Sequence, residues 1–324
     1  MRKLRIVPDG TRLRFMWLRN VTFPVSAVLL VASVLGFIFV GPDYGIDFRG
    51  GTMIEMRPQA EEVDVSLVRS ELAELGLGDV QVQQVTDLVE TEPNILVRIE
   101  LQEGGDEAQQ AAIASIRSQL DDRVDFRRVE SVGPRVSGEL ASKGTIALLV
   151  TLAAVMLYIW LRFEWQFSIG AILATVHDVL ITLGFFVIAG LEFNLASIAA
   201  VLTIVGYSLN DTVVVYDRIR ENLRKYKRLE ISDLLDLSIN EMLARTAMTS
   251  LTTILALIAL YIFGGSVLRD FIAAMIFGVI AGTYSSVFIA APVLIFFHLR
   301  PGAMSKSDED ESDGNEEGAA PQQA

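Results

Sequence analysis

One carboxylate lies inside a long apolar stretch of this sequence. Residues 193–216 form a run of twenty-four residues whose single charged member is Asp211. A run of that length and polarity spans a bilayer, and a carboxylate inside it costs about 2.5–3.5 kcal/mol on insertion scales. Intramembrane carboxylates usually handle ions or protons. The alternative stays open that Asp211 reaches the membrane interface or caps a neighbouring backbone.

Two further titratable residues, His177 and Asp178, interrupt the apolar run 165–191. Adjacent helical residues point about 100° apart, so their side chains do not face one partner squarely. Asp178 can hydrogen-bond to polar residues of a neighbouring helix, and His177 can titrate near neutral pH. The pair is therefore either a proton relay or a structural contact between helices, which typically contributes about 1 kcal/mol or less.

Arg245 comes directly before an apolar run, and hydroxyl residues follow it in the segment RTAMTSLTT, residues 245–253. A polar start to a membrane helix indicates that water or a polar partner reaches inward. Arg245 is thus either a functional cation or an anchor that extends its charge to the interface.

Composition argues against several other kinds of site. The sequence has no cysteine and only two histidines, His177 and His298. It therefore predicts no disulfide or thiolate site, no His-based metal site and no cofactor. No dense basic patch with interleaved aromatic residues is present, so we expect no nucleic-acid partner.

The elements that position these residues are predicted to be membrane helices. Hydrophobic residues make up 52% of the 324 residues, and the mean hydropathy is +0.43. Both values indicate a polytopic membrane protein. Six apolar runs are expected to span the bilayer, at 21–42, 144–161, 165–191, 193–216, 246–268 and 271–297.

Basic residues orient the predicted spans. The basic segment 1–20 places the N-terminus in the cytoplasm by the positive-inside rule. Six spans return the C-terminus to the same side, and a basic loop near 217–245 agrees with that count. Residues 301–324 form an acidic tail without large apolar side chains, which we expect to be cytoplasmic and disordered.

The segment 43–136 is expected to be one extracytoplasmic α+β domain. Its region 43–139 holds 21 acidic and 9 basic residues, which keep it soluble. Asp64 is a plausible N-cap for a helix. The expected elements follow the β-α-β-β-α-β order of a ferredoxin-like domain: strand 47–57, helix 64–75, strands 80–85 and 95–101, helix 107–120 and strand 124–132.

Glycine motifs carry structural predictions. In GIDFRGGT, residues 45–52, glycines 45, 50 and 51 permit positive φ before the first strand. A phosphate-binding loop is disfavoured there because the Lys-Ser/Thr pair is missing.

GLGD at 76–79 resembles a protease motif but lies in the soluble domain. Gly278 and Gly282, four residues apart, predict close approach of two helices within this chain or with a partner.

The motifs together resemble the SecD/SecF family of bacterial protein-export membrane proteins, within the RND superfamily. The Asn210–Asp211 pair and the small first soluble domain favour the SecF type over the SecD type. The matching segments are GIDFRGGT (45–52), SVGPRVSGEL (131–140), HDV (177–179), VGYSLNDTVVVYDRIRE (205–221), RTAMTSLTT (245–253), FGGSVLRDF (263–271) and GTYSSVFIAAP (282–292).

The resemblance implies a non-enzymatic, multi-pass protein of the bacterial inner membrane, half of an RND-like unit. It implies pairing with SecD, association with the SecYEG channel, YajC and indirectly SecA, and action on unfolded preproteins with energy from the proton-motive force. Proton-handling residues are then expected among His177, Asp178, Asn210, Asp211 and Arg245. Protonation of Asp211 would depend on the distance to Arg245.

Two rival functions remain open. One is half of an RND-type transporter of small molecules or lipids, for which a larger extracytoplasmic region would be expected. The other is an assembly factor without proton flux, in which neutralising Asp211 is harmless as long as the complex forms.

Overall fold

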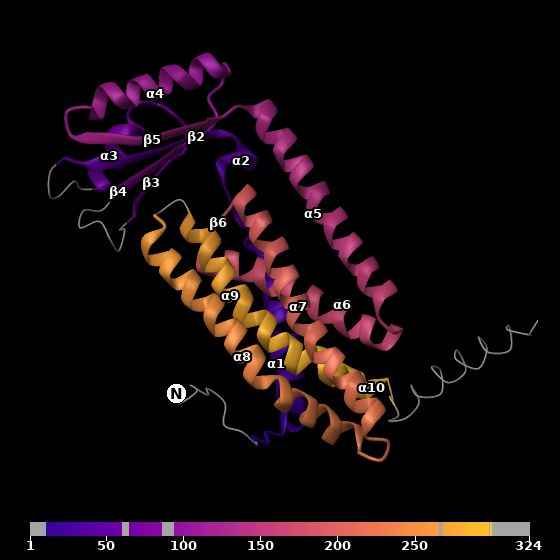
Figure 1. Ribbon diagram of the computed structural model, residues 1–324. Helices are drawn as coiled ribbons and strands as arrows, with labels where there is room; N and C mark the ends of the chain where they lie inside the picture. The colour runs from indigo at the N-terminus through magenta and orange to yellow at the C-terminus, as the bar shows by residue number, and fades with distance from the viewer. Residues whose placement is uncertain (1–10, 60–64, 86–93, 266–267, 298, 300–324) are drawn as a thin grey trace, which may run out of the picture.

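The computed structural model describes residues 11–59, 65–85, 94–265, 268–297 and 299. It consists of a bundle of long helices with a small sheet domain at one end (Figure 1). Within these residues, six helical segments are long and apolar enough to cross a membrane. The predicted fold class, a polytopic helical membrane protein with one α+β domain, is confirmed. The tail 301–324 and the expected N-cap Asp64 lie outside the described residues.

The membrane-spanning segments run close to the predicted apolar runs but start earlier in several places. The sixth span contains a π-helical turn, η2, between α9 and α10. The bounds are α1 Phe15–Phe39, α5 Pro134–Arg162, α6 Trp165–Ala189, α7 Leu195–Lys225, α8 Ile231–Phe263, α9 Arg269–Ser285, η2 Ser286–Ala290 and α10 Ala291–Phe296.

Burial separates the spans into an inner and an outer set. The most apolar windows of α6, α7 and the α9–α10 span are 50%, 50% and 67% buried, against 11%, 6% and 11% for α1, α5 and α8. The outer helices expose large apolar side chains such as Leu29, Leu149 and Leu255, as expected of surfaces that face lipid or another membrane helix. The candidate residues on α6 and α7 thus lie on inner helices.

The predicted basic loop near 217–245 is mostly helical. Only residues 226–230 separate α7 from α8, because both helices extend beyond the apolar runs. Ile219 and Leu223 of α7 are buried in one cluster with Leu234, Leu235 and Ile239 of α8. An apolar contact between the two extensions therefore holds them in helical form, which a hydropathy reading of single runs does not detect.

The sheet domain has the predicted β-α-β-β-α-β order. Its strand order is β3-β4-β2-β5, and all neighbouring strands are antiparallel. The bounds are β2 Gly51–Pro58, α3 Val65–Ala73, β3 Val80–Val85, β4 Asn94–Ile99, α4 Asp106–Leu120 and β5 Val124–Val132. This arrangement is ferredoxin-like.

One face of this sheet packs against its two helices. Ile54 of β2 and Val97 of β4 are fully buried with Leu72 of α3 and Ile116 of α4. Side chains alternate across a strand, so Met53, Glu55 and Arg98 lie on the opposite face, which lines a cleft toward the helix bundle.

The glycine-rich junction before the sheet differs in part from the prediction. Residues Ile46–Arg49 form a short helix, α2, so the first strand starts at Gly51 rather than at 47. Gly50 and Gly51 have φ of +78° and +114°, as predicted, but Gly45 has φ −68°. A Cβ atom at Gly45 would overlap the carboxylate of Glu192, so close approach explains that glycine.

A two-stranded parallel ribbon caps the end of the bundle that faces the domain. β1, Asp43–Tyr44, follows α1, and β6, Glu192–Phe193, lies between α6 and α7. The register pairs Asp43 with Glu192 and Tyr44 with Phe193. This β1–β6 ribbon fixes the ends of the first, third and fourth spans relative to one another.

Candidate functional site

Asp178 of α6 connects three inner helices. Its Oδ2 accepts hydrogen bonds from Ser208 Oγ of α7 at 2.5 Å and from Ser285 Oγ of α9 at 2.6 Å. Its Oδ1 lies 3.0 Å from Nδ1 of His177. The side chain of Asp178 is fully buried, and both oxygens have partners. This satisfied geometry suits a polar joint between helices.

His177 extends the joint toward α1. Its ring lies beside the ring of Tyr284, with centroids 6.3 Å apart. The Tyr284 hydroxyl lies 2.8 Å from Oγ of Ser26 in α1. His177 Nε2 is buried and has no hydrogen-bond partner among the described residues. The adjacent pair His177–Asp178 therefore contacts different neighbours, as the helical spacing predicts, and is also joined by its own hydrogen bond.

Asp211 of α7 lies in a second cluster. Its side chain is 5% exposed, and its Oδ2 has no hydrogen-bond partner in the described part of the chain. Thr246 of α8 and Ser286 of η2 lie close enough to interact with the carboxylate. Oγ1 of Thr246 also has no hydrogen-bond partner there. In contrast to Asp178, Asp211 thus retains an acceptor that a proton or a cation can use.

Arg245 of α8 lies within electrostatic range of Asp211 but forms no described ion pair with it. Its side chain is exposed at the surface of this chain. Asn210 is also exposed, whereas its neighbour Asp211 is buried. The structure therefore places Asp211 and Arg245 within electrostatic range without a described ion pair, His177 and Asp178 in a separate joint, and Asn210 at an exposed position of α7.

Hydroxyl side chains join α7 to α8 and to the sixth span. Oγ1 of Thr212 lies 3.1 Å from Oγ of Ser286. Oγ of Ser250 in α8 lies 2.6 Å from Oγ1 of Thr283 in α9, and the Tyr207 hydroxyl donates to Ser250 at 3.4 Å. Such groups both donate and accept hydrogen bonds, so they can pass protons or order water between these helices.

Backbone features of the sixth span bring these hydroxyls to α7. A Cβ atom at Gly278 would overlap Ile204, and one at Gly282 would lie 2.9 Å from Cβ of Ser208. The predicted close approach thus occurs within this chain, between α9 and α7. The π-helix η2 follows at once, beginning at Ser286; π-helical turns inside α-helices are frequent at functional sites.

Sequence reasoning missed four buried residues of this site: Ser208, Thr212, Ser285 and Ser286. A signal for two of them was present, since the consecutive serines Ser285 and Ser286 in GTYSSVFIAAP interrupt an apolar span. Their partners depend on packing between helices, and no local pattern specifies it. Among the described residues, no group of three or more metal-binding side chains is assembled.

Comparisons with known proteins identify the family of this chain. The model described as protein export membrane protein SecD/SecF, C-terminal, matches residues 112–300. The SecD/SecF GG motif matches residues 36–61, which include Gly50 and Gly51. The protein translocase subunit SecF of Rhodobacter capsulatus is 42% identical over 330 residues, covering 98% of this chain and 99% of that protein.

Longer relatives contain the same region as a part. SecDF of Brucella abortus is 43% identical over 95% of this chain, which spans 40% of that protein. The crystal structure of SecDF from Thermus thermophilus, described as a translocon-associated membrane protein, matches with a TM-score of 0.79 at 36% identity. That match covers 89% of this chain and 39% of the SecDF chain.

A second SecDF structure, in a super-membrane-facing form, matches 95% of this chain with a TM-score of 0.66 and 35% identity. The family match over more than half of the residues and the full-length relative lead to the same assignment. This chain belongs to the SecD/SecF family of protein-export membrane proteins.

Proposed function

We propose that this chain is a SecF-type subunit that uses the proton-motive force, together with SecD, to promote preprotein translocation and release on the far side of the bacterial inner membrane. The observation that carries the proposal is the unpartnered carboxylate oxygen of Asp211 on a central helix. A buried acceptor without a partner is costly, and a bound proton would lower that cost by removing the charge, which supports a role in proton binding.

The partners follow from the family. This chain matches one part of SecDF chains that are more than twice its length, so SecD is the partner expected to supply the remaining part. The SecYEG channel, YajC, SecA and the unfolded preprotein complete the proposed assembly. Both termini would lie in the cytoplasm and the ferredoxin-like domain in the periplasm, because the basic segments favour that orientation.

The proposed cycle uses the proximity of Asp211 and Arg245. With Arg245 close, the ionised form of Asp211 is favoured; as the helices move and Arg245 withdraws, protonation avoids an unpaired buried charge. A charge that crosses the membrane potential gains about 2.3 kcal/mol per 100 mV. That energy is enough to bias a two-state helix arrangement, to which the ferredoxin-like domain would respond through α1 and α5.

The test uses membrane vesicles with an imposed proton gradient. Asp211→Asn and Arg245→Met should preserve expression and SecD pairing, abolish stimulation of export by the gradient, and leave ATP-driven early translocation intact. Asp217→Asn is the matched control, because Asp217 lies on the same helix but is exposed. Stimulation of the Asp211→Asn protein to the wild-type level would refute the proposal and favour an assembly factor without proton flux.

A further inference from the structure

Arg98 of β4 joins the ferredoxin-like domain to the helix bundle. Its Nη1 lies 3.3 Å from Oδ2 of Asp43, and its Nη2 contacts Oε2 of Glu192. Asp43 and Glu192 are register partners in the β1–β6 ribbon, so one guanidinium bridges both strands. The side chains of Arg98 and Glu192 are each 15% exposed, and charge pairs this buried are screened less by salt than surface pairs.

A third carboxylate adds to the negative charge at this point. The backbone N–H of Glu192 donates to Oδ2 of Asp270 in α9 at 2.8 Å. Three acidic side chains from β1, β6 and α9 thus meet around one arginine from the sheet. Burial raises the pKa of Glu192, and Asp270 and Asp43 add to that rise against the opposing effect of Arg98. The ribbon therefore carries like charges that Arg98 partly neutralises.

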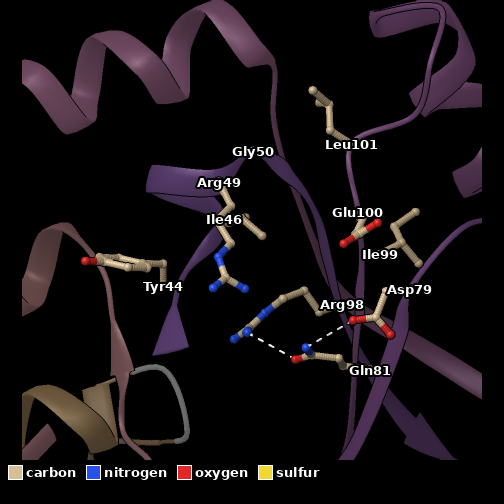
Figure 2. Close-up of a pocket in the computed structure, with 10 residues that line it drawn as sticks. All are labelled: Tyr44, Ile46, Arg49, Gly50, Asp79, Gln81, Arg98, Ile99, Glu100 and Leu101. Atoms are coloured by element: carbon tan, nitrogen blue, oxygen red, sulfur yellow. Dashed lines mark hydrogen bonds between the residues drawn. The ribbon is translucent and has the colours of Figure 1, made fainter. Parts of the chain in front are cut away.

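Beside Arg98, a cleft separates the sheet from the helix bundle. A cleft of about 460 Å³ lies between the open face of the sheet, including Met53 and Leu96, and the bundle end, including Ala196. Figure 2 shows the side chains of Arg49 and Arg98 entering a neighbouring cavity, with Asp79 and Gln81 beside Arg98. Both ion pairs of Arg98 cross from the sheet to the β1–β6 ribbon of the bundle.

We propose that Arg98 is an electrostatic latch that positions the ferredoxin-like domain on the bundle by binding the paired carboxylates of the β1–β6 ribbon. Breaking the latch leaves the domain connected through the junction at Gly50–Gly51 and through Gly133 before α5. The glycines at both connections permit a change of tilt. The latch thereby supplies the contact through which bundle motion reaches the domain, a consequence that rests on the proposed function.

The test measures the distance across the cleft in the full chain together with SecD in lipid nanodiscs. The chain has no cysteine, so Gln83→Cys on β3 and Ala196→Cys on α7 introduce two spin labels, one on each wall of the cleft. Double electron–electron resonance should give one short distance for this background. Arg98→Glu should shift most of the population to longer distances, because four carboxylates then face one another.

Three further variants make the result decisive. Arg98→Glu combined with Glu192→Arg should restore part of the short-distance population, which a purely steric role of Arg98 would not produce. Asp43→Asn combined with Glu192→Gln removes both ribbon charges with little change of shape and should also open the cleft. Arg123→Glu breaks an ion pair with Glu71 inside the domain and should leave the distance unchanged.

A short distance that persists in both Arg98→Glu and the Asp43→Asn/Glu192→Gln protein overturns the latch. Opening of the cleft by Arg123→Glu also overturns it, because disturbance of the domain itself would then explain the change. Failure of the proposed function is separate: if Asp211→Asn retains gradient-stimulated export while Arg98→Glu opens the cleft, the latch stands and its link to proton use is lost.

Discussion

Ser285 and Ser286 are consecutive residues, yet their hydroxyl groups face two different carboxylates. Ser285 donates to Asp178 at 2.6 Å, whereas Ser286 faces Asp211 and lies 3.1 Å from Thr212. The π-helix begins between them. The sixth span is therefore the element that touches both the satisfied joint at Asp178 and the open acceptor at Asp211.

Serine-to-alanine changes should separate the two clusters. Ser286→Ala removes a donor beside Asp211 and should lower gradient-stimulated export about 2–10-fold, the equivalent of one hydrogen bond worth about 0.5–1.5 kcal/mol. Ser285→Ala should leave export near the wild-type level, because Ser208 still donates to Asp178, and should cost about 0.6 kcal/mol of stability. Vesicle export and thermal unfolding in detergent measure the two effects. Loss of gradient-stimulated export in Ser285→Ala but not in Ser286→Ala would contradict the separation of the two clusters.

Asp178 should tolerate asparagine better than alanine. Asp178→Ala leaves the hydroxyls of Ser208 and Ser285 without their shared acceptor, so we expect a loss of about 2 kcal/mol in detergent unfolding. Asp178→Asn keeps an oxygen acceptor and should retain most of the stability and most of the export. A folded Asp178→Asn protein without gradient-stimulated export would instead identify Asp178, with His177, as a proton relay.

The sequence predicted the spans well because long apolar runs are a property of single segments. The extensions of α7 and α8 beyond the apolar runs were not predicted. α8 begins at Ile231 rather than near Thr246, because Leu234 and Ile239 pack against apolar residues of α7. Part of the Asp211 cluster could be predicted from the sequence, namely the charge of Asp211 and the hydroxyl residues that follow Arg245. The role of Ser286 depends on the π-helix and on helix packing, which a single sequence does not encode locally.

Glycine packing gives a prediction with an internal control. Gly278→Ala should destabilise the protein by about 1–3 kcal/mol, because a Cβ atom there overlaps Ile204 of a central helix. At Gly138 in α5 an added Cβ atom meets no atom within 4 Å. Gly138→Ala should therefore stabilise the protein by about 0.4–1 kcal/mol, because alanine lowers the conformational entropy of the unfolded chain. Thermal unfolding of both variants in one detergent checks this. Equal effects would show that the α7–α9 contact is loose.

Membrane orientation can be checked with single cysteines in this cysteine-free chain. Glu100→Cys in the ferredoxin-like domain and Lys227→Cys between α7 and α8 are both at exposed positions. An impermeant thiol reagent added to spheroplasts should label position 100 and should label position 227 only after lysis. The reverse pattern would invert the proposed topology.

The stability of the folded chain should depend on pH through Glu192. The pKa of Glu192 lies above its ordinary value of 4.5 mainly because burial disfavours the anion. In the unfolded chain Glu192 meets water and its pKa falls back. The folded chain therefore binds the proton more tightly, and this contribution to stability is fully present below pH 4.5 and is lost as the pH rises through the raised pKa.

The charged groups facing Glu192 differ in their effect on its pKa. Arg98 on β4 opposes the rise, whereas Asp43 on β1 and Asp270 on α9, beside Arg269, leave excess negative charge around it. Protonating Glu192 relieves that repulsion in the folded chain. Thermal unfolding in detergent should therefore move to higher temperature as the pH falls from about 8 toward about 5, and a tenfold change in the folding equilibrium corresponds to about 1.4 kcal/mol. Glu192→Gln should weaken this dependence relative to the wild-type protein, and an unchanged pH dependence in that variant would contradict the assignment to Glu192.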